Sequence, residues 1–283
     1  MLQKQTLIKQ GWLRVFLFLV VYLLLLFSSN VVLTFIAFVG NENNTFPNFY
    51  TSILFNFLVS VLLVSVFTKL INRSSFSALG LQWKKAAKER WIGFITGIFL
   101  SCFIASVLWL LQLLQWFTDA IDLVSLLITI GLLMLVALGE ELVFRGYILG
   151  NMMQSTSKEA ALVFSALVFA IMHSLNPNFN VTAFINIFLA GLLLGINYMF
   201  TRNLWFGILL HFSWNFFQGS VLGFPVSGLQ LPSLLQQNSS GSILLTGGQF
   251  GLEASWLTSF AFAATIFMLY TLFAKKYKVL PVI

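Results

Sequence analysis

Charged residues are scarce in this chain. Only 8% of its 283 residues are Asp, Glu, Lys or Arg, whereas 59% are hydrophobic. A soluble globular domain carries about 25% charged residues, so the composition indicates a chain that exposes its apolar side chains to lipid rather than to water. The net charge of +7 does not indicate nucleic-acid binding, because the basic residues lie in short loops between long apolar runs.

Cysteine and several familiar catalytic motifs are also missing. The single cysteine, Cys102, excludes an intrachain disulfide framework and a multi-cysteine metal site. The sequence has no His-Glu-x-x-His, Gly-x-Ser-x-Gly or phosphate-binding-loop pattern. It therefore does not support a soluble zinc protease, a serine hydrolase or a nucleotide-binding protein.

Long apolar segments are what the chain has instead. Most of them approach or exceed the roughly 20 residues that a membrane-spanning helix needs. The segments are about 12–39, 49–71, 91–117, 122–152, 159–175, 181–200, 203–223 and 253–274. The first is too long for the apolar core of a signal peptide and is expected to be retained. We therefore predict an all-α polytopic membrane helix bundle with about eight transmembrane helices, forming a single transmembrane domain over residues 1–283.

The positions of the charged residues predict the orientation of this bundle. In the eight-helix arrangement, all fifteen lysines and arginines fall on one side of the membrane. The loops on the opposite side carry only acidic residues, namely Glu42, Asp119, Asp122 and Glu253. Short cytoplasmic loops are enriched in Lys and Arg. We therefore predict that both termini are cytoplasmic and that the protein is a multi-pass protein of the plasma membrane.

The most unusual polar group interrupts segment 122–152, where Glu140, Glu141 and Arg145 follow a long apolar run. An ionisable side chain inside a membrane costs at least about 2.5 kcal/mol, so such residues generally have partners and a function. Glu141 and Arg145 are four residues apart and can pair on one helix face. Glu140 lies about 100° further round the helix, which leaves it as the unpaired carboxylate.

A histidine in the next segment is expected to meet Glu140. Segments 122–152 and 159–175 form a helical hairpin around the turn at 155–157. Glu140 lies about fifteen residues before this turn and His173 sixteen or seventeen residues after it. At about 1.5 Å per residue, both side chains reach a similar depth. Glu140 is thus a candidate general base with His173 as its partner, and Phe169, one turn earlier, is expected to pack against the imidazole.

Segment 203–223 carries the second histidine. His211 and Asn215 are four residues apart and share one helix face. Neither forms an anion, so both suit donation of hydrogen bonds to a developing oxyanion. Hydrogen bonds between helices would explain either histidine alone, but they explain the joint presence of Glu140, His173, His211 and Asn215 less well.

These patterns resemble a known family of membrane proteins. Glu-Glu-x-x-x-Arg at 140–145, Phe-x-x-x-His at 169–173 and His-x-x-x-Asn at 211–215 follow one another on successive segments, within a region of about 122–220. In this order they are similar to the motifs of the CPBP family, the CAAX prenyl endopeptidases and bacteriocin-processing or immunity (Abi) proteins. The resemblance implies an eight-helix intramembrane endopeptidase. In it, Glu140 and His173 activate water, His211 and Asn215 stabilise the oxyanion, and Glu141 and Arg145 fill the remaining motif positions.

Two alternatives stay open at the level of sequence. Glu140, His173 and His211 could be three ligands of a zinc ion with water in the fourth position, and zinc would then be the cofactor. We favour the version without a cofactor, because Asn215 shares a face with His211 and an amide is a poor zinc ligand but a good oxyanion donor. A non-catalytic immunity factor, scaffold or transporter is the other alternative, although a transporter is less supported because the chain shows no internal repeat.

The expected partners follow from the apolar composition and the family resemblance. They are the lipid bilayer and a membrane-associated peptide or protein substrate, with no nucleic acid. A prenylated C-terminal peptide and a leader or pheromone peptide are both compatible with the resemblance, and the sequence does not predict an oligomeric state. We expect segments 122–152, 159–175 and 203–223 to be neighbours whose polar side chains converge on one cavity.

Overall fold

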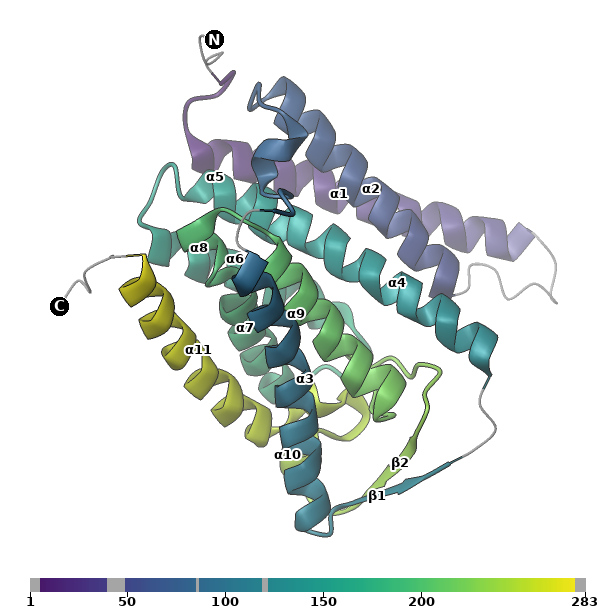
Figure 1. Cartoon of the computed structure of the whole chain (residues 1–283). Coiled ribbons are helices and arrows are strands. Elements are labelled where there is room, and N and C mark those ends of the chain that lie inside the picture. Colours follow the sequence, from purple (N-terminus) through teal and green to yellow (C-terminus); the bar gives the residue numbers. More distant parts are fainter. Residues whose placement is uncertain (1–5, 40–48, 85–86, 119–121, 278–283) are drawn as a thin grey trace.

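The computed structural model describes residues 6–39, 49–84, 87–118 and 122–277 of the chain. Its long helices run antiparallel or obliquely to one another and form a bundle (Figure 1). They are α1 (Gly11–Val39), α2 (Phe49–Leu70), α3 (Ala87–Leu110), α4 (Leu123–Glu141), α6 (Lys158–Met172), α7 (Val181–Gly195), α9 (Trp205–Asn215) and α11 (Trp256–Lys276). The prediction of an all-α polytopic bundle is confirmed.

Shorter elements extend or connect these helices. Two π-helices continue long helices, η2 (Leu142–Leu149) after α4 and η4 (Phe216–Val221) after α9. The remaining helical turns are η1 (Phe76–Leu79), α5 (Gly150–Met152), η3 (His173–Leu175), α8 (Tyr198–Thr201), α10 (Ile243–Thr246), η5 (Gly248–Phe250) and η6 (Leu252–Ala254). Strands β1 (Leu114–Phe117) and β2 (Gln236–Ser239) pair antiparallel, with Leu114 opposite Ser239.

Seven helical stretches among the described residues are long and apolar enough to cross a membrane. The predicted segment 203–223 is the exception, because α9 and η4 together cover only 205–221 and form a shorter helix than the other spans. Segment 91–117 is also corrected, since α3 ends at Leu110 and the next apolar residues form β1. By contrast, α4, η2 and α5 form one continuous span from Leu123 to Met152, as predicted.

Polar side chains define where the site-bearing helices begin. Asp122 caps α4 by accepting hydrogen bonds from the backbone N–H groups of Val124 and Ser125, both at 3.1 Å. Ser157 caps α6 in the same way at the predicted hairpin turn. Such caps satisfy N–H groups that the first turn of a helix leaves without a partner. The caps therefore fix the starts of the two helices that carry Glu140 and His173.

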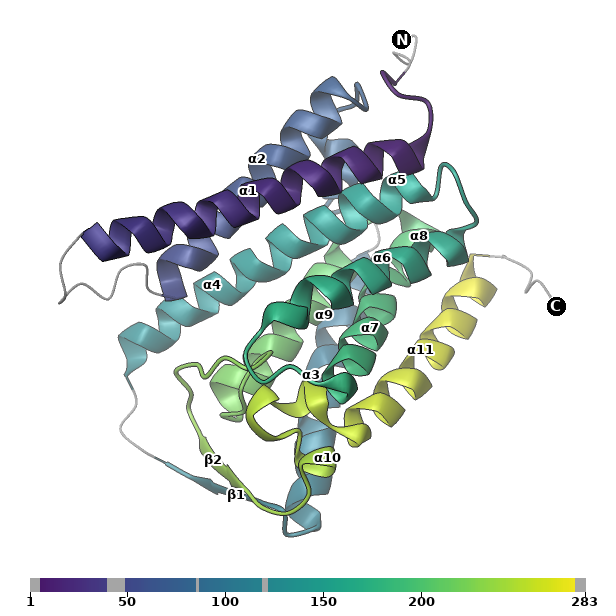
Figure 2. The same cartoon turned by 180° about the vertical axis from the view of Figure 1, so that it is seen from behind.

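The helices form two groups on either side of α4. Helices α1 and α2 lie along one side of α4, and α3, α6, α7, α9 and α11 lie on the other (Figures 1 and 2). Helix α4 contacts both α2 and α9, α6 contacts α7, and α9 packs closely against α3. The three segments expected to be neighbours, now α4, α6 and α9, thus surround the middle of the bundle.

The start of α9 is anchored by the segment before α3. The backbone carbonyl of Gly80 accepts from the N–H of Leu204 at 2.9 Å, and the indole of Trp205 donates to the carbonyl of Leu81 at 3.0 Å. Gly80 has φ of 108°, and a Cβ there would lie 2.5 Å from the carbonyl oxygen of Arg202. Only glycine tolerates both constraints. This contact therefore sets the position of the helix that carries His211.

The start of α1 and the end of α11 lie at the same end of the bundle (Figure 2). The backbone N–H of Gly11 donates to the Ser155 hydroxyl at 2.7 Å, next to the end of α5. Near the end of α11, Lys276 pairs with Glu89 in the first turn of α3. This arrangement agrees with the predicted topology, whose cytoplasmic orientation stays a prediction.

Candidate active site

Glu140 and Glu141 occupy the last turn of α4, directly before the π-helix η2. A π-helical turn forms i to i+5 hydrogen bonds and is wider than an α-helical turn, and such turns are frequent at functional sites. Every residue of η2 is buried. A second π-helix, η4, begins directly after Asn215. Glu140, Glu141 and Asn215 thus each lie at a junction between an α-helix and a π-helix.

Glu141 forms the ion pair that the sequence predicted. Its Oε1 accepts from Arg145 Nη1 at 2.7 Å, and both side chains are almost completely buried. Arg145 also donates through Nη2 to the carbonyl of Gly191 on α7 at 3.1 Å. Its guanidinium lies 4.5 Å from the centre of the Phe169 ring, a distance typical of a cation–π contact. The pair therefore ties α4 to both α6 and α7.

Glu141 also contacts His211, which the sequence analysis did not foresee. Oε1 of Glu141, the same oxygen that accepts from Arg145, lies 3.3 Å from Nδ1 of His211. An ionised carboxylate can only accept hydrogen bonds, so Nδ1 of His211 carries a hydrogen and donates it. This contact directs the opposite ring nitrogen, Nε2, towards Glu140.

Glu140 lies between the two histidines. Its Oε2 is 3.9 Å from Nε2 of His173 and 3.9 Å from Nε2 of His211. These distances exceed a direct hydrogen bond, but one water molecule can bridge groups at this separation. The Glu140 side chain keeps 28% of its surface exposed, although its Oε2 is buried and has no direct hydrogen-bond partner. The structure thus brings together the carboxylate and both imidazoles, as the hairpin geometry predicted for Glu140 and His173.

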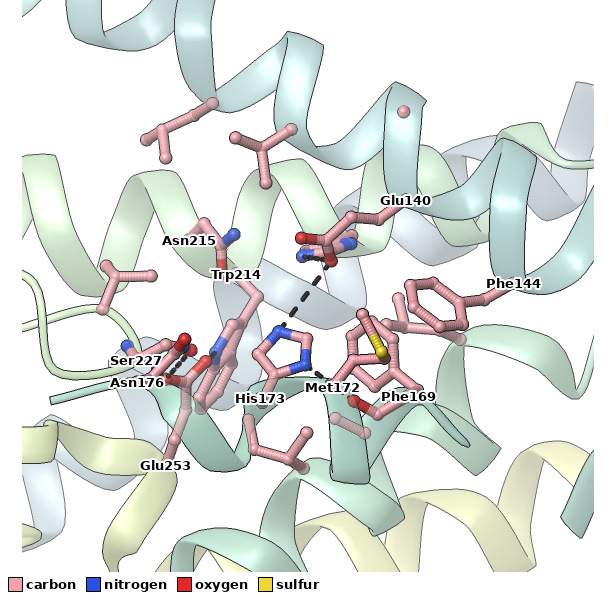
Figure 3. Close-up of a pocket in the computed structure, with 18 of the residues that line it drawn as sticks. Glu140, Phe144, Phe169, Met172, His173, Asn176, Trp214, Asn215, Ser227 and Glu253 are labelled. Carbon is pink, nitrogen blue, oxygen red and sulfur yellow. Dashed lines mark hydrogen bonds and ion pairs between the residues drawn. The ribbon is translucent and has the colours of Figure 1, made fainter. Parts of the chain in front are cut away.

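His173 is held by its own helix. Its Nδ1 lies 2.7 Å from the carbonyl oxygen of Phe169, one turn earlier (Figure 3). Because a carbonyl only accepts, Nδ1 carries a hydrogen, and Nε2 is the ring nitrogen that faces Glu140. The Phe169 and His173 rings also contact each other, with centroids 4.4 Å apart. The expected packing of Phe169 on the imidazole is confirmed.

A cavity of about 340 Å³ surrounds these groups, and Glu140, His173, His211 and Asn215 all line it. Figure 3 shows Asn215 on the same helix as Trp214, facing the space between Glu140 and His173. Helices α1 and α2 complete one wall through apolar and hydroxyl side chains, among them Tyr22, Leu26, Ile53, Phe57 and Ser60. The four side chains therefore share one cavity inside the bundle, as expected from the sequence.

The cavity also contains a second carboxylate, Glu253, to which the sequence assigned no role in the site. It belongs to η6, in the segment that connects η4 to α11. Its Oε1 accepts from the indole of Trp214 at 3.2 Å, and its Oε2 accepts from the backbone N–H and hydroxyl of Ser227 at 2.6 and 2.9 Å. The sequence signal was a lone acid in an otherwise uncharged loop, which does not reveal a contact with a residue 39 positions earlier.

The side-chain types of this site suit a zinc ion better than the distances between their donor atoms do. Two imidazole nitrogens and a carboxylate form a common catalytic zinc set, and histidine ligands usually donate their other N–H to an oxygen. Two donors on one tetrahedral zinc lie about 3.3 Å apart, given metal–ligand bonds of about 2.0–2.1 Å. Each imidazole here lies 3.9 Å from Glu140. Within the described part of the chain, no group of three His, Cys, Asp or Glu side chains has metal-binding geometry.

Comparison with known proteins supports the family suggested by the motifs. Residues 122–217 match the family described as Type II CAAX prenyl endopeptidase Rce1-like. No curated protein and no solved structure matches the chain. The matched region contains all three motifs, and with them Glu140, His173, His211 and Asn215, whereas Glu253 lies outside it. The seven candidate spans agree with an integral, multi-pass protein. Over residues 122–217, about a third of its length, the chain is thus similar to the Rce1-like type II CAAX prenyl endopeptidases.

Proposed function

We propose that the protein is an intramembrane endopeptidase that hydrolyses a peptide bond without a metal ion. The observation that carries this proposal is the position of Glu140, whose buried Oε2 is equidistant from Nε2 of His173 and His211 at the edge of the cavity. The similarity of residues 122–217 to a protease family supports a protein or peptide substrate. Glu140 and His173 then activate water, and His211 and Asn215 stabilise the oxyanion.

The geometry around Glu140 suits activation of one water molecule. Nε2 of His173 and Oε2 of Glu140 are both acceptors, so a water molecule between them donates one hydrogen to each. With O–H donors about 2.8 Å from their acceptors, such acceptors lie roughly 4–4.5 Å apart, close to the observed 3.9 Å. Glu140 takes a proton from this water while the water oxygen attacks the carbonyl carbon of the substrate. The same proton then passes to the leaving amide nitrogen.

Stabilisation of the oxyanion requires a hydrogen on Nε2 of His211. Since Nδ1 already donates to Glu141, His211 acts as a doubly protonated imidazolium. The charges then alternate along the row Arg145, Glu141, His211 and Glu140, and their sum is zero. When Glu140 accepts the proton from water, the new negative charge appears on the oxyanion, so the sum stays zero throughout the step. In a medium of low dielectric constant this balance avoids an uncompensated buried charge.

Substitutions at Glu140 and His173 test the proposal. We expect Glu140→Gln and His173→Ala each to reduce kcat by about 10²–10⁴-fold, the usual contribution of general-base catalysis. Cleavage is measured on purified protein in lipid nanodiscs, with Met172→Leu as a matched cavity variant that should stay active. Folding is checked by thermal unfolding and gel filtration. Substantial turnover by either folded variant would remove these residues from the mechanism.

Metal analysis tests the zinc alternative separately. We expect the active, purified protein to contain much less than one equivalent of zinc and to keep its activity after treatment with a chelator. Stoichiometric zinc, with activity lost on its removal and restored on its return, would instead favour Glu140, His173 and His211 as ligands.

A further inference from the structure

Helix α2 carries an amide side chain that has no hydrogen-bond partner in the part of the chain that the structure describes. This residue, Asn56, is the only amide or charged residue between Tyr50 and Lys69, within a helix apolar enough to cross a membrane. Its side chain is exposed and lines the cavity. An unpaired polar group in apolar surroundings is costly, so polar residues at such positions generally have a function.

The other polar lining residues of α1 and α2 bond to each other. Ser60 lies one turn after Asn56 and also lines the cavity. Its hydroxyl oxygen is 3.1 Å from that of Tyr22 on α1, and both side chains are buried. This hydrogen bond joins the two helices and satisfies both hydroxyl groups. On the wall that α1 and α2 form, the amide of Asn56 is therefore the group available to a ligand.

Asn56 also lies at the level of the proposed base. Helices α2 and α4 come close together at Gly139, where a Cβ would lie 3.1 Å from Cδ2 and 3.8 Å from Cα of Phe57. Asn56 directly precedes Phe57, and Glu140 directly follows Gly139. Both side chains line the same cavity. A ligand that contacts Asn56 is thus held beside the carboxylate of Glu140.

The chemistry of a primary amide indicates what this ligand is. The side chain of Asn offers a carbonyl acceptor and two N–H donors. Its complement is a group that donates and accepts along one edge, as the N–H and C=O of one residue do in an extended chain. A lipid phosphate would use only the donors. A peptide that is unwound for cleavage has backbone groups without partners, and these are costly in apolar surroundings.

Resting on the proposed endopeptidase function, we infer that Asn56 binds the backbone of the substrate next to the scissile bond. The amide forms paired hydrogen bonds with the N–H and C=O of one extended residue. These bonds replace the ones that the unwound peptide has lost, and they hold the scissile bond beside Glu140. Because the contact is made to the backbone, it is independent of the side chains of the substrate. Asn56 lies outside the matched region 122–217.

A cycle that alters Asn56 and the substrate backbone in turn tests this inference. Two pools of apolar peptides, one prenylated near a free C-terminus and one unmodified, are incubated with wild-type protein in phosphatidylcholine nanodiscs. The best-cleaved peptide is resynthesised with a single N-methyl group at each residue within three positions of the cleaved bond, which removes one backbone N–H at a time. The value of kcat/KM is measured for wild-type protein, for Asn56→Leu and for Leu58→Ala. Leu58 is a matched control, because it is exposed on α2 but does not line the cavity.

We expect Asn56→Leu to lower kcat/KM about 10–30-fold, the usual effect of losing two neutral hydrogen bonds. Leu58→Ala should change it by less than about threefold. Asn56→Leu should unfold at the same or a higher temperature, because it removes an unpaired amide. At one position, N-methylation should slow cleavage by wild-type protein about tenfold more than cleavage by Asn56→Leu. Wild-type cleavage by Asn56→Leu would overturn the inference. N-methyl effects of equal size in both proteins would also overturn it, since Asn56 would then contact lipid or water.

Failure of the proposed function gives a different result. If wild-type protein cleaves neither pool, retention of the pools is compared between wild-type protein and Asn56→Leu, after subtraction of partition into protein-free nanodiscs. Retention about tenfold higher in wild-type protein would support the binding role of Asn56 while the endopeptidase function fails. Equal retention by the two proteins, or none, would reject both.

Discussion

One carboxylate oxygen of Glu141 accepts hydrogen bonds from two residues. That oxygen accepts from Arg145 at 2.7 Å and from His211 at 3.3 Å, and all three side chains are buried. We expect Glu141→Gln to destabilise the protein by about 3–5 kcal/mol, because it leaves the Arg145 charge buried without its counter-ion. We also expect it to reduce kcat, because His211 loses the carboxylate that holds its imidazolium. Thermal unfolding and cleavage assays measure the two effects.

A double variant separates these effects. Glu141→Gln with Arg145→Gln removes both charges, so most of the lost stability should return, whereas activity should stay low. If the double variant regained wild-type turnover, Glu141 would act only by compensating Arg145, and its contact with His211 would have no catalytic role.

Much of the arrangement of the polar residues in the cavity could be predicted from the sequence, because it depends on helix geometry. The i, i+4 spacing predicted the Glu141–Arg145 pair, and the similar distances from the 155–157 turn predicted that Glu140 and His173 meet. The contact of Glu141 with His211 was not predictable in this way. It depends on the rotation of α9 relative to α4, which side-chain packing between the two helices determines. Glu253 was missed for a similar reason, because its partners lie on other elements.

Helix α9 approaches the carboxylates through a glycine one turn before His211. A Cβ at Gly207 would lie 2.6 Å from Oε2 of Glu141 and 2.9 Å from the carbonyl oxygen of Leu194. We expect Gly207→Ala to push α9 or Glu141 out of place and to reduce kcat at least about tenfold. The change should occur although alanine is favoured over glycine in a helix by about 0.8–1.0 kcal/mol.

Gly131 on α4 offers a matched control for this substitution, because a Cβ there meets no atom within 4 Å. Gly131→Ala should leave cleavage unchanged and unfold at the same or a slightly higher temperature. Comparable activity of the two alanine variants would show that α9 and Glu141 can separate without harm to the site.

At the level of elements, the periodic apolar segments predicted the helices well and their ends less well. Residues 111–117 are apolar except for Gln112 and Gln115 and continue the pattern of α3, yet they leave the helix. Gln112 has φ of 60°, and the following residues pair with β2, more than 100 positions later. Similarly, the π-helices η2 and η4 carry no periodic signal that distinguishes them from α-helix. Both features depend on long-range packing, which local sequence patterns do not contain.

For the whole molecule, the arrangement of the basic residues predicts an orientation that reporter fusions can test. We expect green fluorescent protein to fluoresce when fused to either terminus, and alkaline phosphatase to be inactive at both, because each reporter then stays in the cytoplasm. As a control, alkaline phosphatase inserted after Gly241, in the loop that precedes α10, should be active. Activity of the phosphatase at either terminus would contradict the predicted topology.

The helices around the site differ greatly in length, and this difference has a consequence for the surrounding lipid. The span that carries Glu140 has 30 residues, whereas the span that carries His173 has 18. At 1.5 Å per residue they measure about 45 Å and about 27 Å, on either side of the roughly 30 Å hydrocarbon core. Helix α6 exposes the side chains of Val163, Leu167 and Ile171, so one face of this short helix lies on the outside of the bundle. We therefore expect the lipid layer beside α6 to be thinner than elsewhere around the bundle. On this expectation, His173 at the end of α6 lies close to the headgroup layer, and water has a short path to a site inside the bundle.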